Sequence, residues 1–184
     1  MKTIDNRLST HEIGVIKKLI GKKLSSYSHE EFVYTNTVSD VVKFLVSNKP
    51  LFLYCFLESN DYFGSNEDIS KLSFESTEYP FLKTKVLIDT KINMKIKKII
   101  IVNDNNQIFE NGIQTYDMWY TRAIIFEFEG FQVSFEKTSW MSEEIKILRG
   151  KSLIDNLTPL SNFCNKENWA KNIEATAKRD IIYL

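Results

Sequence analysis

Histidine and cysteine are the residues of this chain with the widest use in catalysis. His11 and His29 are too far apart in the sequence to lie on adjacent turns of one helix, where paired histidines can hold a metal. Each lies in a polar stretch, so we expect solvated side chains. Cys55 belongs to the apolar run 51–57, and Cys164 lies in a polar turn. We expect two free thiols and no cysteine metal site.

The remaining motifs for cofactor binding and nucleophilic catalysis are incomplete. The chain has no GxxxxGKS, GxxxxGKT or GxGxxG sequence that could hold a nucleotide phosphate. Gly64-Ser65 lacks the second glycine of a nucleophile elbow. Asp104 lies among asparagines as in a calcium loop, but Thr115 stands where the terminal glutamate is required. We therefore expect no metal and no cofactor.

Glutamates could still supply the carboxylate pair that glycoside hydrolysis uses. They gather in one region, at Glu127, Glu129, Glu136, Glu143 and Glu144. Glu127 and Glu129 alternate with phenylalanine, which is the pattern of a sheet face turned to water, so we interpret them as structural. One alternative stays open: a small hydrolase or transferase in which Cys164, a histidine and a glutamate meet through space.

Two segments carry aromatic residues that local structure does not require. Residues 58–68 combine four acids with two aromatics and no base, and we expect an acidic loop. Residues 116–120 are mostly aromatic, which is typical of interfaces, although Trp119 and Tyr120 could instead close the edge of the core. The predicted partner contacts are Asp61, Tyr62, Glu67, Asp68, Tyr116 and Trp119.

Short strands should position these segments. The clearest is a hairpin over 123–136, in which a turn at Glu129-Gly130 sets Phe126 against Val133 and Ile124 against Phe135. Its other face, with Glu127, Gln132, Ser134 and Glu136, should be wet. The polar run 103–106 predicts a tight turn, and the lysine-rich region 83–98 a solvated strand edge. Further strands are expected at 32–35, 40–46, 51–57, 72–76, 95–102 and 143–148.

A helix is expected near each end of the chain. Ser9 and Glu12 form a capping-box pattern at the start of an amphipathic helix over about 10–20. After Pro159, apolar residues recur four apart at Trp169, Ile173 and Ala177, which predicts a second helix. The predicted fold class is α+β: a mostly antiparallel sheet with the N-terminal and C-terminal helices packed on it.

Length and composition bound the function. The 184 residues predict a single domain over 1–184. Lys plus Arg and Asp plus Glu both number 24, so no overall field attracts nucleic acid or an anionic membrane. The first residues lack the apolar core of a signal peptide, and no apolar run is long enough to span a bilayer. We expect a cytoplasmic protein that binds neither nucleic acid nor membrane.

Residues 130–147 run from a glycine hairpin into a strand, then a tryptophan and a charged strand. In this order they resemble the small α+β immunity proteins encoded beside bacterial polymorphic and contact-dependent toxins. The resemblance implies a non-enzymatic protein that binds a cognate toxin domain, encoded nearby, and blocks its active site. A generic scaffold or interaction domain is a further alternative. The oligomeric state is left open.

Overall fold

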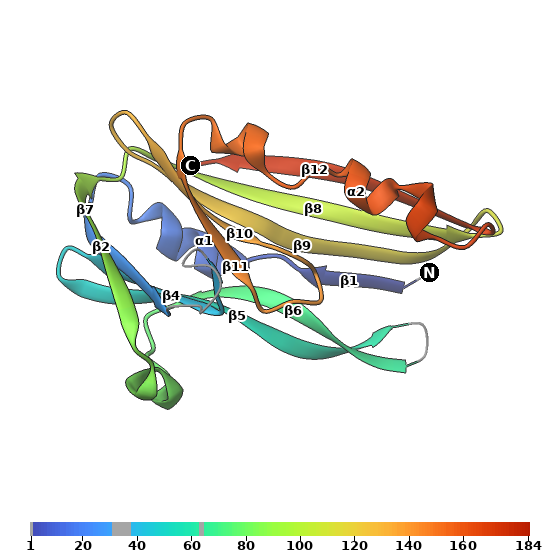
Figure 1. Ribbon diagram of the computed structural model, residues 1–184, viewed down its shortest axis with the longest axis horizontal. Helices are drawn as coiled ribbons and strands as arrows, with labels where there is room; N and C mark the ends of the chain where they lie inside the picture. The colour runs from blue at the N-terminus through green and yellow to red at the C-terminus, as the bar shows by residue number, and fades with distance from the viewer. Residues whose placement is uncertain (1, 31–37, 63–64) are drawn as a thin grey trace.

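A computed structural model describes residues 2–30, 38–62 and 65–184, and in this part the chain forms two β-sheets (Figure 1). Sheet A contains, in spatial order, β12 (Ile173–Tyr183), β8 (Lys98–Glu110), β9 (Ile113–Glu127), β10 (Gln132–Lys137), β11 (Ile145–Gly150) and β3 (Val38–Ser39), with β1 (Lys2–Asn6) beside β9. Sheet B contains β6 (Ser65–Glu75), β5 (Lys49–Tyr62), β4 (Val41–Val46), β2 (Lys23–Glu30) and β7 (Leu87–Lys95). Among these strands only the β1–β9 pairing is parallel.

Helices are few in the described residues, so the prediction of an α+β fold is wrong. Among the helices of the described residues, α1 (Thr10–Lys17) is the one that exceeds two turns. The others are η1 (Pro80–Thr84), η2 (Leu153–Asn156), α2 (Ser161–Cys164) and η3 (Lys166–Asn168). The predicted antiparallel sheet is confirmed, but it forms two sheets with one N-terminal helix.

The C-terminal segment is a strand where the sequence suggested a helix. β12 pairs with β8 over its whole length, from Ile173 opposite Glu110 to Tyr183 opposite Ile100. A spacing of four residues places side chains on one face of a helix, but it also places them on one face of a strand, because the strand period is two. Trp169, Ile173 and Ala177 therefore fitted both structures, and pairing with β8 decided between them.

The predicted N-terminal helix and its cap are confirmed, although the helix ends earlier, at Lys17. Ser9 and Glu12 form the full capping box: the Glu12 carboxylate accepts a hydrogen bond from the Ser9 amide at 2.8 Å, and the Glu12 amide donates to Ser9 Oγ at 3.2 Å. Glu12 also accepts from the Phe74 amide at 3.0 Å, which ties the helix to β6. Ile16 is fully buried.

The predicted hairpin over 123–136 is confirmed in its register. Phe126 pairs with Val133 and Ile124 with Phe135, and the turn closes with the Phe128 amide donating to the Phe131 carbonyl at 2.9 Å. Gly130 has a φ of 80°, which explains why glycine is required there.

The opposite face of this hairpin is covered rather than wet. Ser134 and Glu136 are buried at 0% and 1% exposure. The segment after β11 lies over this face, and two of its backbone amides bond to side chains there: Leu153 donates to Gln132 and Thr158 donates to Glu136, both at 2.8 Å. The polar side chains thus serve as acceptors for a covering segment that alternation alone does not reveal.

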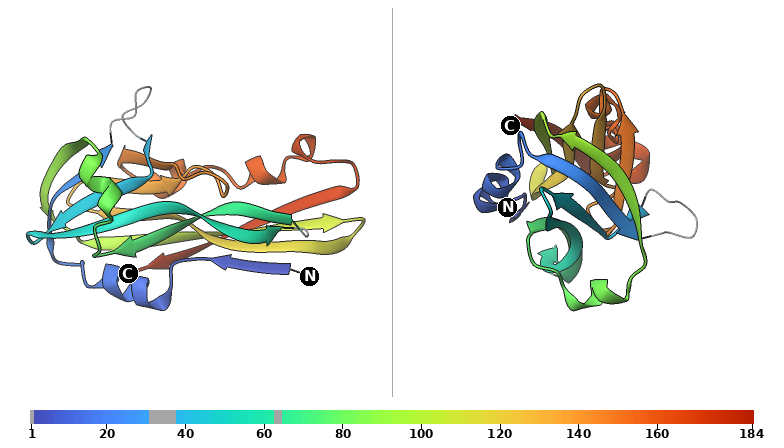
Figure 2. Two further views of the ribbon diagram at one scale, coloured as in Figure 1. Left: turned by 90° about the horizontal axis from the view of Figure 1, so that it is seen from below. Right: turned by 90° about the vertical axis from the view of Figure 1, so that its left-hand side faces the viewer.

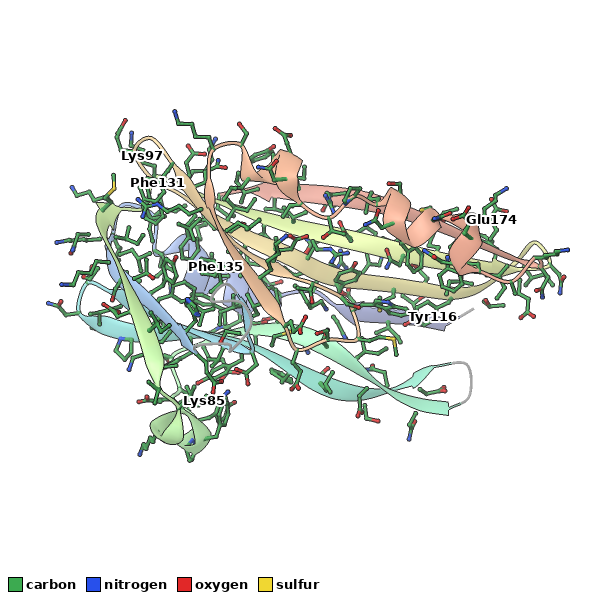
Figure 3. The ribbon with its side chains drawn as sticks, viewed as in Figure 1. Lys85, Lys97, Tyr116, Phe131, Phe135 and Glu174 are labelled. Atoms are coloured by element: carbon green, nitrogen blue, oxygen red, sulfur yellow. The ribbon has the colours of Figure 1, made fainter. Side chains whose placement is uncertain are left out.

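The main core joins both sheets and α1, and Phe44 of β4 lies at its centre. The Phe44 ring is 5.3 Å from Phe126 and 5.0 Å from Phe135, both in sheet A, and 5.7 Å from Phe74 in β6. Figure 3 shows Phe135 between the sheets. The two sheets pack against each other through aromatic side chains in edge-to-face and tilted contacts, and such packing holds a β-sandwich together.

Other predicted elements have mixed outcomes. The lysine-rich region forms β7, an edge strand of sheet B, as expected. The run 103–106 lies inside β8 and is not a turn. The strand predicted at 32–35 lies outside the described residues. The strands near 40–46, 51–57, 72–76 and 143–148 fall within or overlap β4, β5, β6 and β11.

We predict that Phe126→Ala lowers the free energy of unfolding by about 3–5 kcal/mol, because it opens a cavity at a fully buried position of the main core. Urea unfolding followed by tryptophan fluorescence measures this. Phe81→Ala, at a 47% exposed ring, is the matched control and should cost less than about 1 kcal/mol. Equal losses in the two variants would contradict the assigned core.

Candidate functional site

The β5–β6 hairpin extends beyond the rest of sheet B. β4 pairs with β5 only as far as Tyr54, whereas β5 and β6 remain paired out to Tyr62 and Ser65. The outer part, residues 57–62 and 65–70, is therefore a two-stranded ribbon, which we call the arm. In Figures 1 and 2 it runs toward the same end of the molecule as the β8–β9 hairpin.

Four of the six predicted contact positions lie on the arm. They were expected in a loop, but they belong to β5 and β6, with Asp61 opposite Asn66, Tyr62 opposite Ser65, Glu67 opposite Asn60 and Asp68 opposite Ser59. Asp61 and Asp68 are exposed and share one face, because strand side chains alternate. The loop prediction failed because polar composition does not reveal whether backbone groups are paired across a hairpin.

The arm is strongly acidic in a chain of balanced charge. Residues 57–70 include four acids and no lysine or arginine. Glu58 is paired with Lys71, whose ammonium nitrogen lies 3.2 Å away at the base of the arm. Two exposed carboxylates lie farther out, on Asp61 and Asp68, and they give this ribbon a local negative charge.

The arm is anchored at its base. Ile69 is 1% exposed and packs against Tyr116 and Met118 of β9. The Ser70 amide donates to the Trp140 carbonyl at 2.8 Å, and Ser70 Oγ donates to the Ser139 carbonyl at 3.1 Å. These contacts hold the base of the arm to sheet A.

Tyr116 lies in the interior, so it does not fit the predicted role of a partner contact. It is 0% exposed, its hydroxyl donates to the Met118 sulfur at 3.4 Å, and its ring is 5.7 Å from Trp140. Trp140 covers Tyr116. Phe163 packs on Trp140, and Trp169 packs on Phe163, so the C-terminal segment extends this cover. Figure 3 labels Tyr116 on β9, in the half of the molecule toward the β8–β9 turn. Sequence reasoning missed the cover because it comes from residues far along the chain.

Trp119 is half-buried, and cations already occupy its surroundings. The Arg7 guanidinium carbon lies 4.8 Å from the ring centroid, and the Lys178 ammonium lies 4.9 Å from it. Asp5 holds Arg7 in place with a 2.6 Å ion pair. Trp119 therefore lies against two cationic side chains of this chain, one of which is paired with a carboxylate.

A buried ionic network in sheet A escaped the sequence predictions. Asp104 of β8 is 0% exposed, and its carboxylate accepts from Arg122 Nε of β9 at 2.9 Å and from Arg179 Nε of β12 at 2.7 Å. Arg122 is the extra residue of a β-bulge, since Thr121 and Ala123 pair with the consecutive residues Asn103 and Val102. An arginine inside an otherwise apolar stretch was the one signal available in the sequence.

Lys137 connects this network to the arm. Its ammonium lies 4.5 Å from the Tyr120 ring centroid and donates to the Ser70 carbonyl at 2.6 Å. Burial lowers the pKa of Lys137 to about 7. The Cys55 thiol lies close enough to interact with it electrostatically, and burial raises the pKa of Cys55 to about 12. At neutral pH Cys55 is a thiol and not a nucleophilic thiolate.

The residues of the alternative enzyme site come from separate elements. His29 lies on β2, is 5% exposed and uses its ring Nδ1 to bond the Glu30 carbonyl at 2.9 Å. His11 is exposed on α1, and Cys164 lies at the end of α2. Across residues 2–30, 38–62 and 65–184, no hydrogen bond joins Cys164 to either histidine, and no three potential metal ligands cluster.

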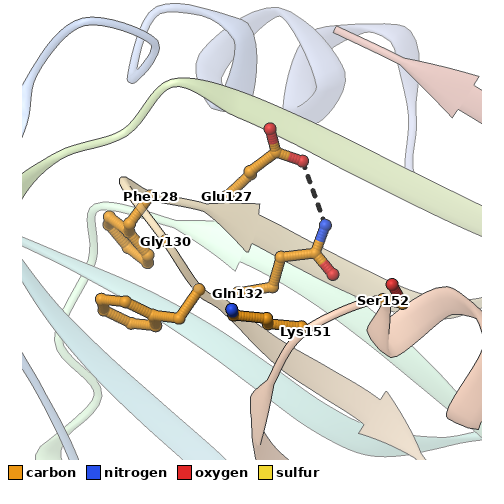
Figure 4. A pocket seen from close by; sticks show the side chains of 7 residues that line it. Glu127, Phe128, Gly130, Gln132, Lys151 and Ser152 are labelled. Carbon is orange, nitrogen blue, oxygen red and sulfur yellow. Dashed lines mark hydrogen bonds between the residues drawn. The ribbon is translucent and has the colours of Figure 1, made fainter.

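A shallow pocket lies at the β9–β10 turn, with a cavity volume of about 270 Å³ (Figure 4). Two of its polar side chains are joined to each other: Gln132 Nε2 donates to Glu127 at 3.0 Å, and Gln132 Oε1 accepts from the Leu153 amide. The Arg149 guanidinium lies 4.0 Å from the Phe131 ring centroid. The hydrogen bond to Leu153 positions η2 against the hairpin.

Comparison of the chain with protein family models, with curated proteins and with solved structures found no match. In the described part of the chain, no helix has the length and apolar character needed to cross a membrane.

We predict that Lys137 makes stability rise with pH above neutrality. The folded protein releases this proton near pH 7, whereas the unfolded chain holds it until its ordinary value of 10.5. The unfolded state therefore binds more protons in this window, and raising the pH favours the folded state. Between pH 7 and pH 8.5 the free energy of unfolding of the original protein should rise by about 2 kcal/mol more than that of Lys137→Met.

Urea unfolding at several pH values measures this difference. Lys23→Met, at an exposed position of β2, controls for the loss of one lysine and should follow the original protein. Stability curves for Lys137→Met and the original protein that stay parallel between pH 7 and 8.5 would rule out the lowered pKa.

Proposed function

We propose that this chain is a non-enzymatic protein-binding domain that recognises a basic partner through the acidic arm. The observation that carries the proposal is the arm itself: a two-stranded ribbon that continues beyond the end of β4, with Asp61 and Asp68 exposed on one face. We further propose that the partner is a toxin domain encoded beside this chain, as for the immunity proteins that residues 130–147 resemble.

The physical role of the arm would be to steer and align the partner. Carboxylates on a projecting element attract a basic surface before contact, which accelerates association more than it strengthens the final complex. A complex of standard size buries about 1,600 Å², so neighbouring residues of the arm, including Tyr62 and Glu67, would share the contact. Trp119 is a weaker candidate, because Arg7 and Lys178 would repel the same basic partner.

We predict that reversing two charges on the arm slows binding. Asp61→Lys combined with Asp68→Lys should lower the association rate constant for the adjacent gene's terminal domain by about tenfold or more at low salt, with a smaller effect at high salt. Stopped-flow mixing or biolayer interferometry measures the rate. Asp155→Lys, an exposed acid in η2 over sheet A, is the matched control and should change it little.

Co-expression tests the biological role. When the proposed toxin domain, the terminal domain of a protein encoded by the adjacent gene, is expressed in cells, co-expression of this chain should prevent its toxicity. A chain that neither binds nor rescues would refute the immunity role. Binding that survives the double reversal as well as it survives Asp155→Lys would show that the partner contacts another surface.

A further inference from the structure

An open pocket of about 320 Å³ lies on the outer face of sheet B, where β5 meets the turn that contains η1. Four aromatic side chains line it: Tyr54, Phe56, Tyr79 and Phe81. Two carboxylate residues, Asp40 and Glu143, complete the lining with Cys55. This surface is separate from the arm's acidic residues and from the ionic network of sheet A.

The two tyrosine rings are held in place by hydrogen bonds of their hydroxyl groups. The Tyr54 hydroxyl donates to the Thr77 carbonyl at 2.9 Å and accepts from the Tyr79 amide at 3.3 Å. The Tyr79 hydroxyl donates to Glu75 at 3.1 Å. The Tyr54 and Tyr79 rings meet edge to face at 4.9 Å, and the Phe81 ring lies parallel to Tyr79 within 8°. The walls are therefore formed before any ligand arrives.

Two of these rings are partly exposed to solvent. Tyr79 is 39% exposed and Phe81 is 47% exposed. Folding gains little from leaving aromatic faces in water, whereas a cation that stacks on them gains both dispersion and the attraction of the ring quadrupole.

The protein already places one of its own ammonium groups here. Lys85 Nζ lies 5.7 Å from the Phe81 ring centroid and makes ion pairs with Glu30 at 2.6 Å and Asp40 at 2.9 Å. Figure 3 shows Lys85 beside η1. Asp40 is thus neutralised by Lys85. Glu143 is exposed, and its carboxylate makes no hydrogen bond or ion pair with the residues that the structure describes.

We propose that this pocket binds an alkylated ammonium cation, with its methyl groups against Tyr54, Tyr79 and Phe81 and its charge balanced by Glu143. The pocket's volume is at the lower end for small-molecule sites, which suits a compact headgroup. Aromatic walls offer few hydrogen-bond acceptors, so they favour a weakly hydrated quaternary ammonium over a primary one, whose hydrogen bonds to water would be lost. This proposal does not depend on the arm's partner.

The test compares choline with 3,3-dimethylbutan-1-ol, its neutral isostere, as probes of the purified protein. Proton NMR follows the methyl signal, which should move upfield as choline saturates a site below about 10 mM. The neutral isostere should bind at least about tenfold more weakly, because it lacks the cation–π and carboxylate attraction. Methylguanidinium should also bind more weakly than choline.

Variants locate the site. Phe81→Ala and Glu143→Gln should each weaken choline binding by about fivefold or more. Tyr183→Ala, an exposed ring on β12, and Glu144→Gln, the neighbouring acid, are matched controls and should leave it unchanged. All four positions are exposed, so unchanged thermal melts should accompany them.

The source of the ammonium group is a separate comparison. Choline represents a free metabolite, and N-acetyl-trimethyllysine methylamide represents a methylated protein side chain. The compound that the pocket binds with the higher affinity indicates the source of the ammonium group. The proposal is overturned if choline causes no saturable shift, if the neutral isostere or methylguanidinium binds as tightly, or if neither Phe81→Ala nor Glu143→Gln weakens binding.

Discussion

The buried carboxylate of Asp104 is the interaction on which the arrangement of sheet A depends. It lies between the guanidinium groups of Arg122 and Arg179, which come from the strands on either side of β8. Removing one partner from a buried charge pair costs about 3–5 kcal/mol, so β8, β9 and β12 must align where these three side chains meet. Arg122 also donates to the Lys137 carbonyl at 2.8 Å, and Arg179 donates to the Thr158 carbonyl at 2.9 Å. One carboxylate thus fixes the end of β10 and the segment that covers the sheet.

The same network determines where the arm begins. Lys137 is the last residue of β10; its carbonyl accepts from Arg122, and its ammonium donates to the Ser70 carbonyl at the base of the arm. Ile69 then fills the apolar cluster beside it. The base of the arm is thus fixed by Lys137, by the hydrogen bonds that Ser70 donates to the Trp140 and Ser139 carbonyls, and by the buried side chain of Ile69. The arm is acidic although the total charge of the protein is zero. Its attachment uses buried contacts at its base and does not depend on its carboxylates.

The sequence predicted local structure and failed where partners were distant. The hairpin at 123–136 could be read because a glycine turn and side-chain alternation fix its register within one short segment. The run 103–106 was misread as a turn because its buried neighbours, Arg122 and Arg179, are related to it by no spacing in the chain. The acids of the arm were found by composition, but their strand pairing was not. Tyr116 looked exposed because its cover comes from Trp140 and the C-terminal segment.

The parallel pairing of β1 with β9 has a consequence for folding. One edge of β9 is shared: residues 123–127 pair with β10, which follows directly, whereas residues 116–120 pair with β1 from the other end of the chain. A hairpin such as β9–β10 forms within about 1–10 μs. The pairing of β1 with β9 joins residues that are far apart in the sequence, and contacts of this kind form more slowly. During that interval the edge at 116–120 presents unpaired backbone groups beside an apolar cluster. A second copy of strand β1, supplied by a neighbouring chain, would fit that edge as well as the chain's own, so late docking of β1 opens a route to strand exchange between molecules.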